Sequence, residues 1–229
     1  MLIDFTHPDQ NVVKYFPPLP AKKAFPEWYK KLPKEYDDQL PEYMDRYKMS
    51  IKDCVPVRDM ISAGYIIRAP FETQFIAVQD DEIQGFKYMS AQPGGVAVHK
   101  HSQCPMHINN TRNDYFKLKT DWEIKTPPGY SCLLIHPFYN FESRFEFLPG
   151  IIDTDRFQGS MNVIGMLKTK ERVDFNPGDP LIQVIPFKRD EWQSTISVKQ
   201  PSKTIFQLFL DYKLSKIYKK FFHSKKRFD

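Results

Sequence analysis

Cysteine, glycine and long apolar runs are all scarce in this chain of 229 residues. Its three cysteines, Cys54, Cys104 and Cys132, are an odd number without paired spacing. A disulfide framework needs pairs, so we expect reduced thiols in an intracellular compartment. No apolar stretch approaches the roughly 20 residues that span a membrane. Residues 2–7 are too short and too polar a run for a signal peptide.

The residues that are present favour β structure. Aromatic side chains make up 15% of the chain, and its 19 prolines outnumber its 9 glycines. Aromatic residues suit pleated sheets, while proline stiffens the loops between strands. A hydrophobic fraction of 41% with 27% charged residues is ordinary for a globular protein, and the length allows a proper core.

Positive charge is concentrated at the C-terminal end. Residues 213–229 hold seven Lys or Arg side chains and one acid, Asp229, which gives this segment a charge of +6. The formal charge of the whole chain is +5, so the other residues are nearly neutral together. Basicity is therefore a property of the tail rather than of the core.

Proline also punctuates residues 1–50, which we expect to form an N-terminal arm. Seven prolines between Pro8 and Pro41 prevent a long helix or a central strand. Yet Phe16, Trp28 and their aromatic neighbours are too apolar for a disordered linker. We therefore predict an extended arm with one short helix near residues 26–31. Its aromatic rings would lie on its own core or on a neighbouring subunit.

From residue 51 onward, short alternating runs predict a β core over residues 51–195. Residues 64–70 and 73–79 are expected to be paired strands around a short turn. Alternation over residues 119–126 predicts a half-buried strand, and the apolar run 130–136 predicts a central one. Short strands at this spacing favour a barrel or a sandwich over a parallel sheet. Further strands are predicted at residues 144–147, 161–167 and 181–185.

The period changes near the C-terminus, where residues 196–229 predict a basic amphipathic helix. Its apolar stripe either docks on the core or leaves the helix free to bind nucleic acid or another polyanion. The apolar residues repeat at helical steps of three and four, at Phe206, Leu210, Leu214, Ile217 and Phe221. The cations predicted to contact a polyanion are Lys219, Lys220, Lys225, Lys226 and Arg227.

Two further segments each allow a binding site or an ordinary loop structure. His99, His101, Cys104 and His107 form the densest group of metal-ligand side chains, and an extended His99-Lys100-His101 would point both imidazoles to one side. Their spacing matches no standard zinc finger, so the alternative is a polar loop with hydrogen-bonded histidines. Residues 92–95 contain a glycine pair, for which a hairpin turn is the expected structure.

Three segments carry a family resemblance. Ala63-Gly64-Tyr65 precedes an alternating run, residues 150–155 read Gly-Ile-Ile-Asp-Thr-Asp, and residues 178–183 read Gly-Asp-Pro-Leu-Ile-Gln. In that order they resemble the motifs of the trimeric dUTPase and dCTP-deaminase superfamily, whose small β-barrel is called a β-clip. The resemblance covers about residues 60–190, with an insertion at about 80–112.

The resemblance implies where a nucleotide site would lie. Asp153 matches the family's water-activating carboxylate, which makes it the predicted catalytic residue. The family's base-stacking tyrosine falls on Arg156 or Phe157. The alternative for Asp153 and Asp155 is a turn in which both side chains bond to nearby backbone. The ligand-binding residues that the resemblance implies are Tyr65, Asp155, Arg156, Phe157 and Gln183.

The phosphate-handling motifs of that family are missing. Its Arg-Ser-Gly motif should follow the strand that ends near His136, but residues 137–141 read Pro-Phe-Tyr-Asn-Phe. A nucleoside triphosphate needs several cations and close backbone amides, and this loop offers bulky rings instead. The family's Gly-rich C-terminal arm is absent too. The match is therefore specific for the fold and poor for catalysis.

The predicted fold is mainly β: a dUTPase-like β-clip barrel with an extended N-terminal arm and a C-terminal amphipathic helix. The proline-rich arm with this core is also similar to proteins of large tailed bacteriophages, which implies a viral origin. We expect a non-catalytic protein that uses the scaffold for assembly or binding, as a virion component. The alternatives are a nucleotide-processing enzyme, either a diphosphohydrolase or a deaminase, and a binder of nucleotide-like ligands.

The resemblance also implies a homo-oligomer, a trimer. Other virion proteins and nucleic acid, contacted weakly through the tail, are the further partners that we expect, and no membrane is among them. The expected location is the host cytoplasm or the virion. No cofactor is predicted, and a divalent metal is left open.

Overall fold

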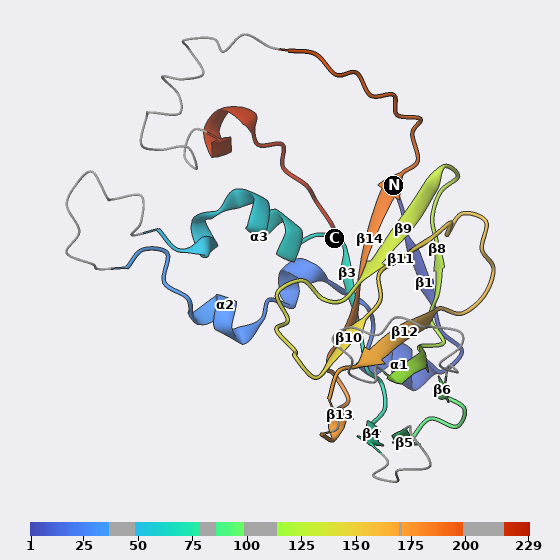
Figure 1. Ribbon diagram of the computed structural model, residues 1–229. Helices are drawn as coiled ribbons and strands as arrows, with labels where there is room; N and C mark the ends of the chain where they lie inside the picture. The colour runs from blue at the N-terminus through green and yellow to red at the C-terminus, as the bar shows by residue number, and fades with distance from the viewer. Residues whose placement is uncertain (37–48, 78–85, 99–113, 170, 199–217) are drawn as a thin grey trace.

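The computed structural model describes residues 1–36, 49–77, 86–98, 114–169, 171–198 and 218–229. They form a body of β-strands with a helical side, where α2, α3 and the C-terminal tail lie (Figure 1). The helices and turns are α1 (Gln10–Tyr15), α2 (Glu27–Lys31), α3 (Val55–Ile61), the 3-10 turns η1 (Ala21–Lys23) and η3 (Ile51–Asp53), and the π-helix η5 (Tyr218–Phe222). The strands are β1 (Asp4–Thr6), β2 (Leu19–Pro20), β3 (Tyr65–Arg68), β4 (Thr73–Ala77), β5 (Phe86–Ser90), β6 (Val96–Val98), β7 (Asp114–Lys119), β8 (Glu123–Lys125), β9 (Tyr130–Ile135), β10 (Phe145–Phe147), β11 (Gly150–Ile152), β12 (Asn162–Leu167), β13 (Val173–Phe175) and β14 (Pro180–Lys188).

The prediction of a mainly β fold is confirmed, but the barrel is not closed. The described strands form four antiparallel sheets, in the orders β11-β9-β14-β3-β2, β10-β12-β7-β6, β13-β4-β5 and β1-β8. Each of these sheets ends in edge strands, so the expected barrel is corrected to a packed set of open sheets. The long strand β14 lies at the centre of the largest sheet, paired with β9 and β3.

The core lies between these sheets and is rich in aromatic rings. On β14, Leu181, Ile182 and Val184 are all buried, which explains why the run 181–185 is apolar apart from Gln183. Burying a large apolar side chain contributes about 1.5–3 kcal/mol. The ring of Phe116 on β7 packs 4.4 Å from that of Phe75 on β4. Among the described residues, no helix has the length and hydropathy that a membrane span requires.

A glycine is required where the chain enters β3. Gly64 has a φ of +68°, which side chains rarely tolerate, and it lies directly against β14. A Cβ at this position would stand 1.9 Å from the carbonyl oxygen of Val184. The glycine of the Ala63-Gly64-Tyr65 segment therefore has a packing reason that is independent of any ligand.

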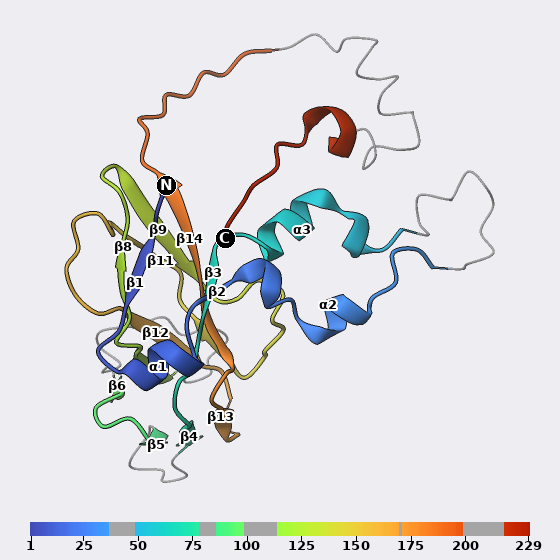
Figure 2. The same ribbon diagram turned by 180° about the vertical axis from the view of Figure 1, so that it is seen from behind.

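The described part of the N-terminal arm packs on its own chain. Strand β1 forms a two-stranded sheet with β8, and β2 pairs with β3 at an edge of the largest sheet. The side chains of Val12 and Tyr29 are buried, and the indole nitrogen of Trp28 donates to the carbonyl oxygen of Tyr139 at 2.9 Å. The short helix expected near residues 26–31 is confirmed as α2. Figure 2 shows α1 and β1 lying along the body from behind.

Three local predictions are wrong. The strands expected at 64–70 and 73–79 do not pair, since β3 joins β14 and β2 while β4 joins β5 and β13. The reason is that Ala69 bonds in both directions with the turn before β14, through its N–H to Asp179 and its carbonyl to Gly178. Residues 92–95 do form a turn, but it connects β5 and β6 of different sheets rather than a hairpin. The strand expected at 119–126 is broken at Asp121, whose φ of 54° separates β7 from β8.

The helix predicted over residues 196–229 is also wrong where the structure describes it. Residues 190–198 and 223–229 have no regular secondary structure, and only the five residues of η5 are helical. The stripe residues Phe206, Leu210, Leu214 and Ile217 lie outside the described residues. The apolar residues do repeat at helical spacing in the sequence. Hydrogen bonds from the last seven residues to Asp59 of α3 and Tyr65 of β3 nevertheless hold this segment extended.

Candidate functional site: an acidic turn paired with Arg189

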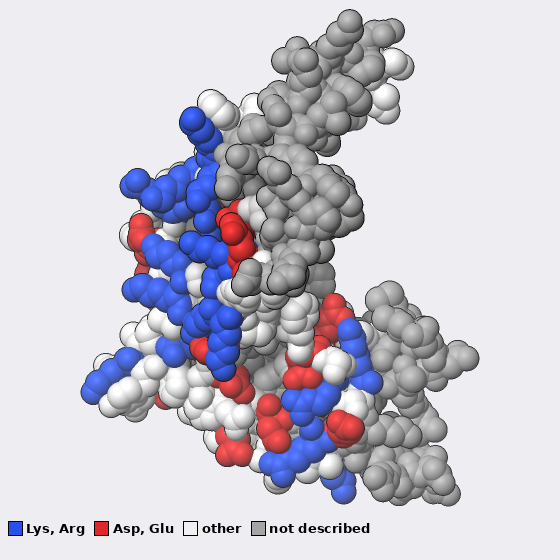
Figure 3. Space-filling view, turned by 90° about the vertical axis from the view of Figure 1, so that its left-hand side faces the viewer, with Lys and Arg blue, Asp and Glu red and all other residues white. Residues whose placement is uncertain are grey.

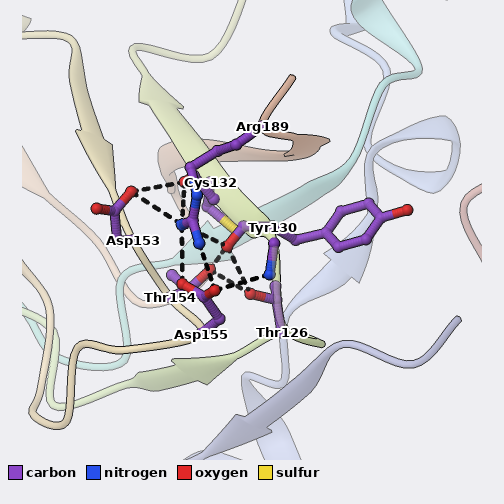
Figure 4. A network of polar contacts seen from close by, with 9 residues as sticks. Thr126, Tyr130, Cys132, Asp153, Thr154, Asp155 and Arg189 are labelled. Atoms are coloured by element: carbon purple, nitrogen blue, oxygen red, sulfur yellow. Dashed lines mark hydrogen bonds and ion pairs between the residues drawn. The ribbon is translucent and has the colours of Figure 1, made fainter. Parts of the chain in front are cut away.

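The acidic turn predicted after residue 152 is present and directly follows β11. Strand β11 lies at the edge of the largest sheet, where it pairs with β9. The carbonyl of Asp153 accepts hydrogen bonds from the backbone N–H groups of Arg156, at 2.9 Å, and Phe157, at 2.8 Å. This tight turn brings the carboxylates of Asp153 and Asp155 to the end of the sheet where β14 terminates (Figure 4).

Both carboxylates converge on Arg189, the first residue after β14. Its Nη1 lies 2.8 Å from Asp155 Oδ1 and 3.1 Å from Asp153 Oδ1, and its Nη2 bonds to Asp155 Oδ2. The pair with Asp155 is therefore bidentate, the strong geometry for an arginine and a carboxylate. The Asp155 side chain is only 6% exposed, whereas that of Asp153 is 53% exposed.

A hydroxyl of β9 and the backbone of Gly129, just before β9, complete this network. The Ser131 hydroxyl donates to Asp153 at 2.7 Å and accepts from Arg189 Nη1 at 2.8 Å. The N–H of Gly129 donates to Asp155 Oδ2 at 2.8 Å, and the Gly129 carbonyl accepts from the Arg189 backbone at 2.8 Å. Three segments, β9, the acidic turn and the end of β14, are thereby joined through one guanidinium group.

A second, neutral layer supports the turn from inside. The hydroxyls of Thr126 and Thr154 share a hydrogen bond of 2.7 Å, and Thr154 also donates to the sulfur of Cys132 at 3.4 Å. Burial raises the pKa of the Cys132 thiol, so it is protonated at neutral pH. A buried, neutral thiol packs rather than reacts, which gives Cys132 a structural role.

The electrostatics of the network stabilise charged carboxylates. Hydrogen bonds from Arg189 and from the Gly129 N–H lower the pKa of Asp155 to about 2. The Ser131 hydroxyl, followed by the charge of Arg189, lowers the pKa of Asp153 as well. A general base works best with a pKa near the operating pH. Both carboxylates are thus shifted away from the range that proton abstraction at neutral pH requires.

The other predicted ligand-binding residues lie apart from this network or face outward. The Gln183 side chain is buried and fully used: its amide donates to the carbonyls of Met60 and Ala63, and its oxygen accepts from Phe138 N–H. The Tyr65 hydroxyl donates to the carbonyl of Asp229 at 3.1 Å. The side chains of Arg156 and Phe157 are exposed beside the acidic turn. Their ligand roles, like the catalytic role of Asp153, stay predictions.

The loop after β9, residues 137–141, holds the N-terminal arm. Its rings of Tyr139 and Phe141 pack 6.1 and 5.2 Å from that of Trp28. His136, at the start of the loop, is largely buried, and burial lowers its pKa. Residues 137–141 contain no Lys or Arg, so this loop contributes aromatic packing and no cationic side chain.

The predicted metal ligands His99, His101, Cys104 and His107 lie outside the described residues. Within the described part of the chain, no group of three or more His, Cys, Asp or Glu side chains could hold a metal ion. Two shallow hollows of about 370 and 490 Å³ share His7, Pro8 and Asp121 in their linings. Neither lining includes the acidic pair or Arg189.

Sequence reasoning missed Arg189 and Ser131. Arg189 stands 34 residues after Asp155, and nothing in the pattern around it distinguishes it from its neighbour Lys188. The available signal was the pair Asp153 and Asp155 itself, because two nearby carboxylates attract a cation to the space between them. Only the antiparallel pairing of β14 with β9 identifies which cation it is.

Beyond Arg189 the chain leaves the body as an extended arm, residues 190–198, here called the projecting arm. Figure 1 shows it running away from the end of β14. Its side chains alternate, with polar residues between Trp192, Ile196 and Val198. These three are 88%, 101% and 99% exposed. Such alternation is the pattern of a strand with one apolar face, and within the described residues the arm pairs with no strand.

A scan against protein-family models finds no match, and a search of curated proteins finds none either. Solved structures similar to this chain include the native dUTPase of EIAV, at 16% identity and a TM-score of 0.36, covering 61% of this chain and 87% of that one. The dUTPase from phage phi11 of S. aureus is similar at 16% identity and a TM-score of 0.34, covering 61% and 86%. The dUTPase of Staphylococcus bacteriophage 80alpha follows at 15% identity and a TM-score of 0.30, covering 62% and 86%. At these scores the likeness supports no argument about activity, and the function is argued from the residues of this chain.

Proposed function

We propose that this chain is a non-catalytic bacteriophage protein that uses a dUTPase-like β scaffold for assembly. The observation that carries the proposal is the pairing of Arg189 with Asp153 and Asp155 at the root of the projecting arm. The carboxylates that a nucleotide hydrolase would use are engaged in holding the point where the arm begins. They therefore act as a structural anchor.

The assembly role follows from what the arm presents. Trp192, Ile196 and Val198 leave three large apolar side chains exposed within seven residues, and clustered exposed apolar side chains mark interaction sites. Strand β11 is an edge strand of the described sheet, and its Ile151 is 65% exposed. An extended segment can add to such an edge through backbone hydrogen bonds, with its apolar side chains setting the register. We assign the arm of one copy to the β11 edge of the next, in a closed trimer.

Two measurements test this proposal separately. The first is pyrophosphate release from dUTP by the purified chain, where we expect no release above that of the Asp153→Asn variant. If the parent chain releases pyrophosphate rapidly and Asp153→Asn abolishes that release, the chain is an enzyme and the non-catalytic assembly role is contradicted. The second is the molar mass in solution by light scattering, where we expect the mass of three chains.

Variants locate the contact on the arm. Trp192→Ser combined with Ile196→Ser should shift the population to monomers, because it removes the largest apolar groups of the arm. The matched control is Met89→Ser, an exposed apolar side chain on β5 that is outside the arm. A monomeric parent chain, or a trimer that survives the double substitution, contradicts assembly through the arm.

The second candidate function is a nucleotide-processing enzyme, either a diphosphohydrolase or a deaminase. One observation favours it: Asp153 is half exposed and stands at the turn position that the resemblance assigns to the water-activating carboxylate. A binder of nucleotide-like ligands would use the same turn without the chemistry. Calorimetric titration with dUTP and dCTP distinguishes this binder from the assembly protein, for which we expect no heat of binding.

A further inference from the structure

The C-terminal tail, residues 223–229, returns to the body and is held there at two places. The Nε2 of His223 lies 3.0 and 3.2 Å from the carboxylate oxygens of Asp59 on α3, and Lys226 Nζ lies 2.6 Å from the same carboxylate. At the end of the chain, Asp229 forms an ion pair with Lys22 of η1. The ring of Phe228 packs edge-on to that of Tyr65, with centroids 6.4 Å apart. The tail is thus a fixed part of the helical side.

This placement joins the cations of the tail to those of the N-terminal arm. Lys23 and Arg227 both lie close enough to Asp229 to act on its charge. Lys52 of η3 connects this region to α2, because its ammonium group donates to the backbone carbonyls of Lys30 and Leu32 at the end of that helix. Figure 3 shows the result: Lys and Arg side chains gather over the upper left of this face, while both signs mix below. We call this surface, formed by η1, α2, α3 and the tail, the basic face.

Three acids of the basic face are paired with cations of the same face. Glu27 pairs with Lys30, Asp59 with Lys226 and His223, and Asp229 with Lys22. Within the described residues, several exposed cations of this face form no ion pair: Lys23, Lys31, Lys34, Lys219, Lys220, Lys225 and Arg227. Surplus charge of one sign on one face attracts a polyanion.

Exposed rings stand among these cations. Phe221 and Phe222 of η5 are both exposed, and Lys220 Nζ lies 5.1 Å from the centre of the Phe221 ring. Rings and cations side by side are the composition of a single-strand binding surface, where bases stack on aromatic faces and phosphates meet lysines. A membrane-binding helix places its rings and cations on opposite faces instead. In η5 the ring of Phe221 and the ammonium group of Lys220 instead lie against each other.

We infer that the basic face binds single-stranded nucleic acid through both ends of the chain at once. The N-terminal lysines contribute as much as the tail, which differs from the contact through the tail alone that the sequence predicts. The binding does not depend on base sequence, because backbone charge and ring stacking carry it. It is also independent of assembly through the projecting arm.

The test measures the affinity of the full chain for a fluorescent oligothymidylate by anisotropy at several salt concentrations. One variant removes the arm cations (Lys23→Gln, Lys31→Gln, Lys34→Gln) and another removes the tail cations (Lys219→Gln, Lys225→Gln, Arg227→Gln). The matched control removes three exposed or half-buried lysines of the sheets (Lys87→Gln, Lys117→Gln, Lys125→Gln). A fourth variant carries Phe221→Ala with Phe222→Ala.

Each cation set should lower the affinity and reduce the slope of log affinity against log salt by about 2, since each single-strand phosphate contact contributes about 0.7. The aromatic variant should lose about tenfold in affinity for the oligothymidylate with little change in salt slope. The sheet control should bind as the parent chain does. Circular dichroism melts confirm that each variant is folded.

Other outcomes overturn the inference. If the variant without the cations of the N-terminal arm binds like the parent chain, the N-terminal lysines do not contribute to the basic face. If the chain binds vesicles of phosphatidylserine and phosphatidylcholine but not the oligothymidylate, the face belongs to a membrane surface. If duplex DNA binds as well as the single strand and the aromatic variant is unaffected, stacking has no role. Absence of binding at low salt removes the proposal altogether.

Discussion

At the end of β14, Arg189 alone pairs with two carboxylates. On the helical side, by contrast, the cations outnumber the three acids that pair with them, Glu27, Asp59 and Asp229. The first region is closed, because Arg189 receives its partners from the acidic turn and from β9. The second region is open, because cations remain after its acids are paired. Charges satisfied within the chain fix the fold, and charges left over are available to a partner. The distinction separates the structural site from the interaction surface.

The largest loss of stability should come from a substitution at Gly64, because β3 packs against β14 there. Arg189 directly follows β14, and Tyr65 of β3 contacts the tail. Gly64→Ala combines a φ of +68° with a Cβ placed 1.9 Å from the Val184 carbonyl, so we expect it to lower the free energy of unfolding by about 3 kcal/mol or more. The matched control is Gly94→Ala, with a φ of +67° and no atom within 4 Å of its Cβ. That control should cost only about 1 kcal/mol. Urea unfolding measures both, and equal losses would show that the contact with β14 is not tight.

The next effect tests the closed region directly. Arg189→Met leaves Asp155 almost buried without its cation, so its melting temperature should fall severalfold more than that of Lys188→Met. The Lys188 pair with Asp190 is exposed, which makes it a suitable control. Arg189→Met combined with Asp155→Asn should be less destabilised than the sum of the two single variants, because the two side chains interact. Additive losses would show that the bidentate pair is not formed.

Acid titration probes the same pair in another way. The pKa of Asp155 is about 2 in the folded protein, below the ordinary value of 3.8. A depressed carboxyl pKa stabilises the fold fully above about pH 4, and the contribution is lost as the pH falls toward 2. Thermal melts between pH 5 and pH 2 should therefore decline less steeply for Asp155→Asn than for the parent chain. Parallel curves would indicate that other carboxyls control the acid transition.

The smallest effect on stability should come from the open region. Asp59→Asn removes the shared partner of His223 and Lys226, but Lys226 is half exposed, so the loss should stay below about 1 kcal/mol. The tail itself should loosen, and trypsin should cleave it at residues 225–227 more rapidly than in the parent chain. Asp174→Asn on β13, which breaks the ion pair with Arg172, is the control and should leave that cleavage unchanged. A tail that stays resistant would show that Phe228 and Lys22 suffice to hold it.

Periodicity and turn chemistry predicted the individual elements better than their partners. The runs 130–136, 161–167 and 181–185 became β9, β12 and β14, because apolar alternation is a local property of a strand with a buried face. The pairing of 64–70 with 73–79 failed because Ala69 bonds to the distant turn at Gly178 and Asp179. The acidic turn was predicted, while Arg189 was not, since the partner of a charge depends on which strands meet.

The sequence by itself determined a mainly β chain, a proline-rich arm with one short helix, the acidic turn after residue 152 and the absence of a cationic phosphate loop. These features follow from side-chain size, polarity and backbone freedom within a few residues. Only the tertiary structure decided that Arg189 anchors Asp153 and Asp155, that residues 223–229 are extended, and that the two ends of the chain share one basic face. Each of these depends on contacts between residues that are distant in the sequence, and local patterns carry no information about which of several similar side chains will meet.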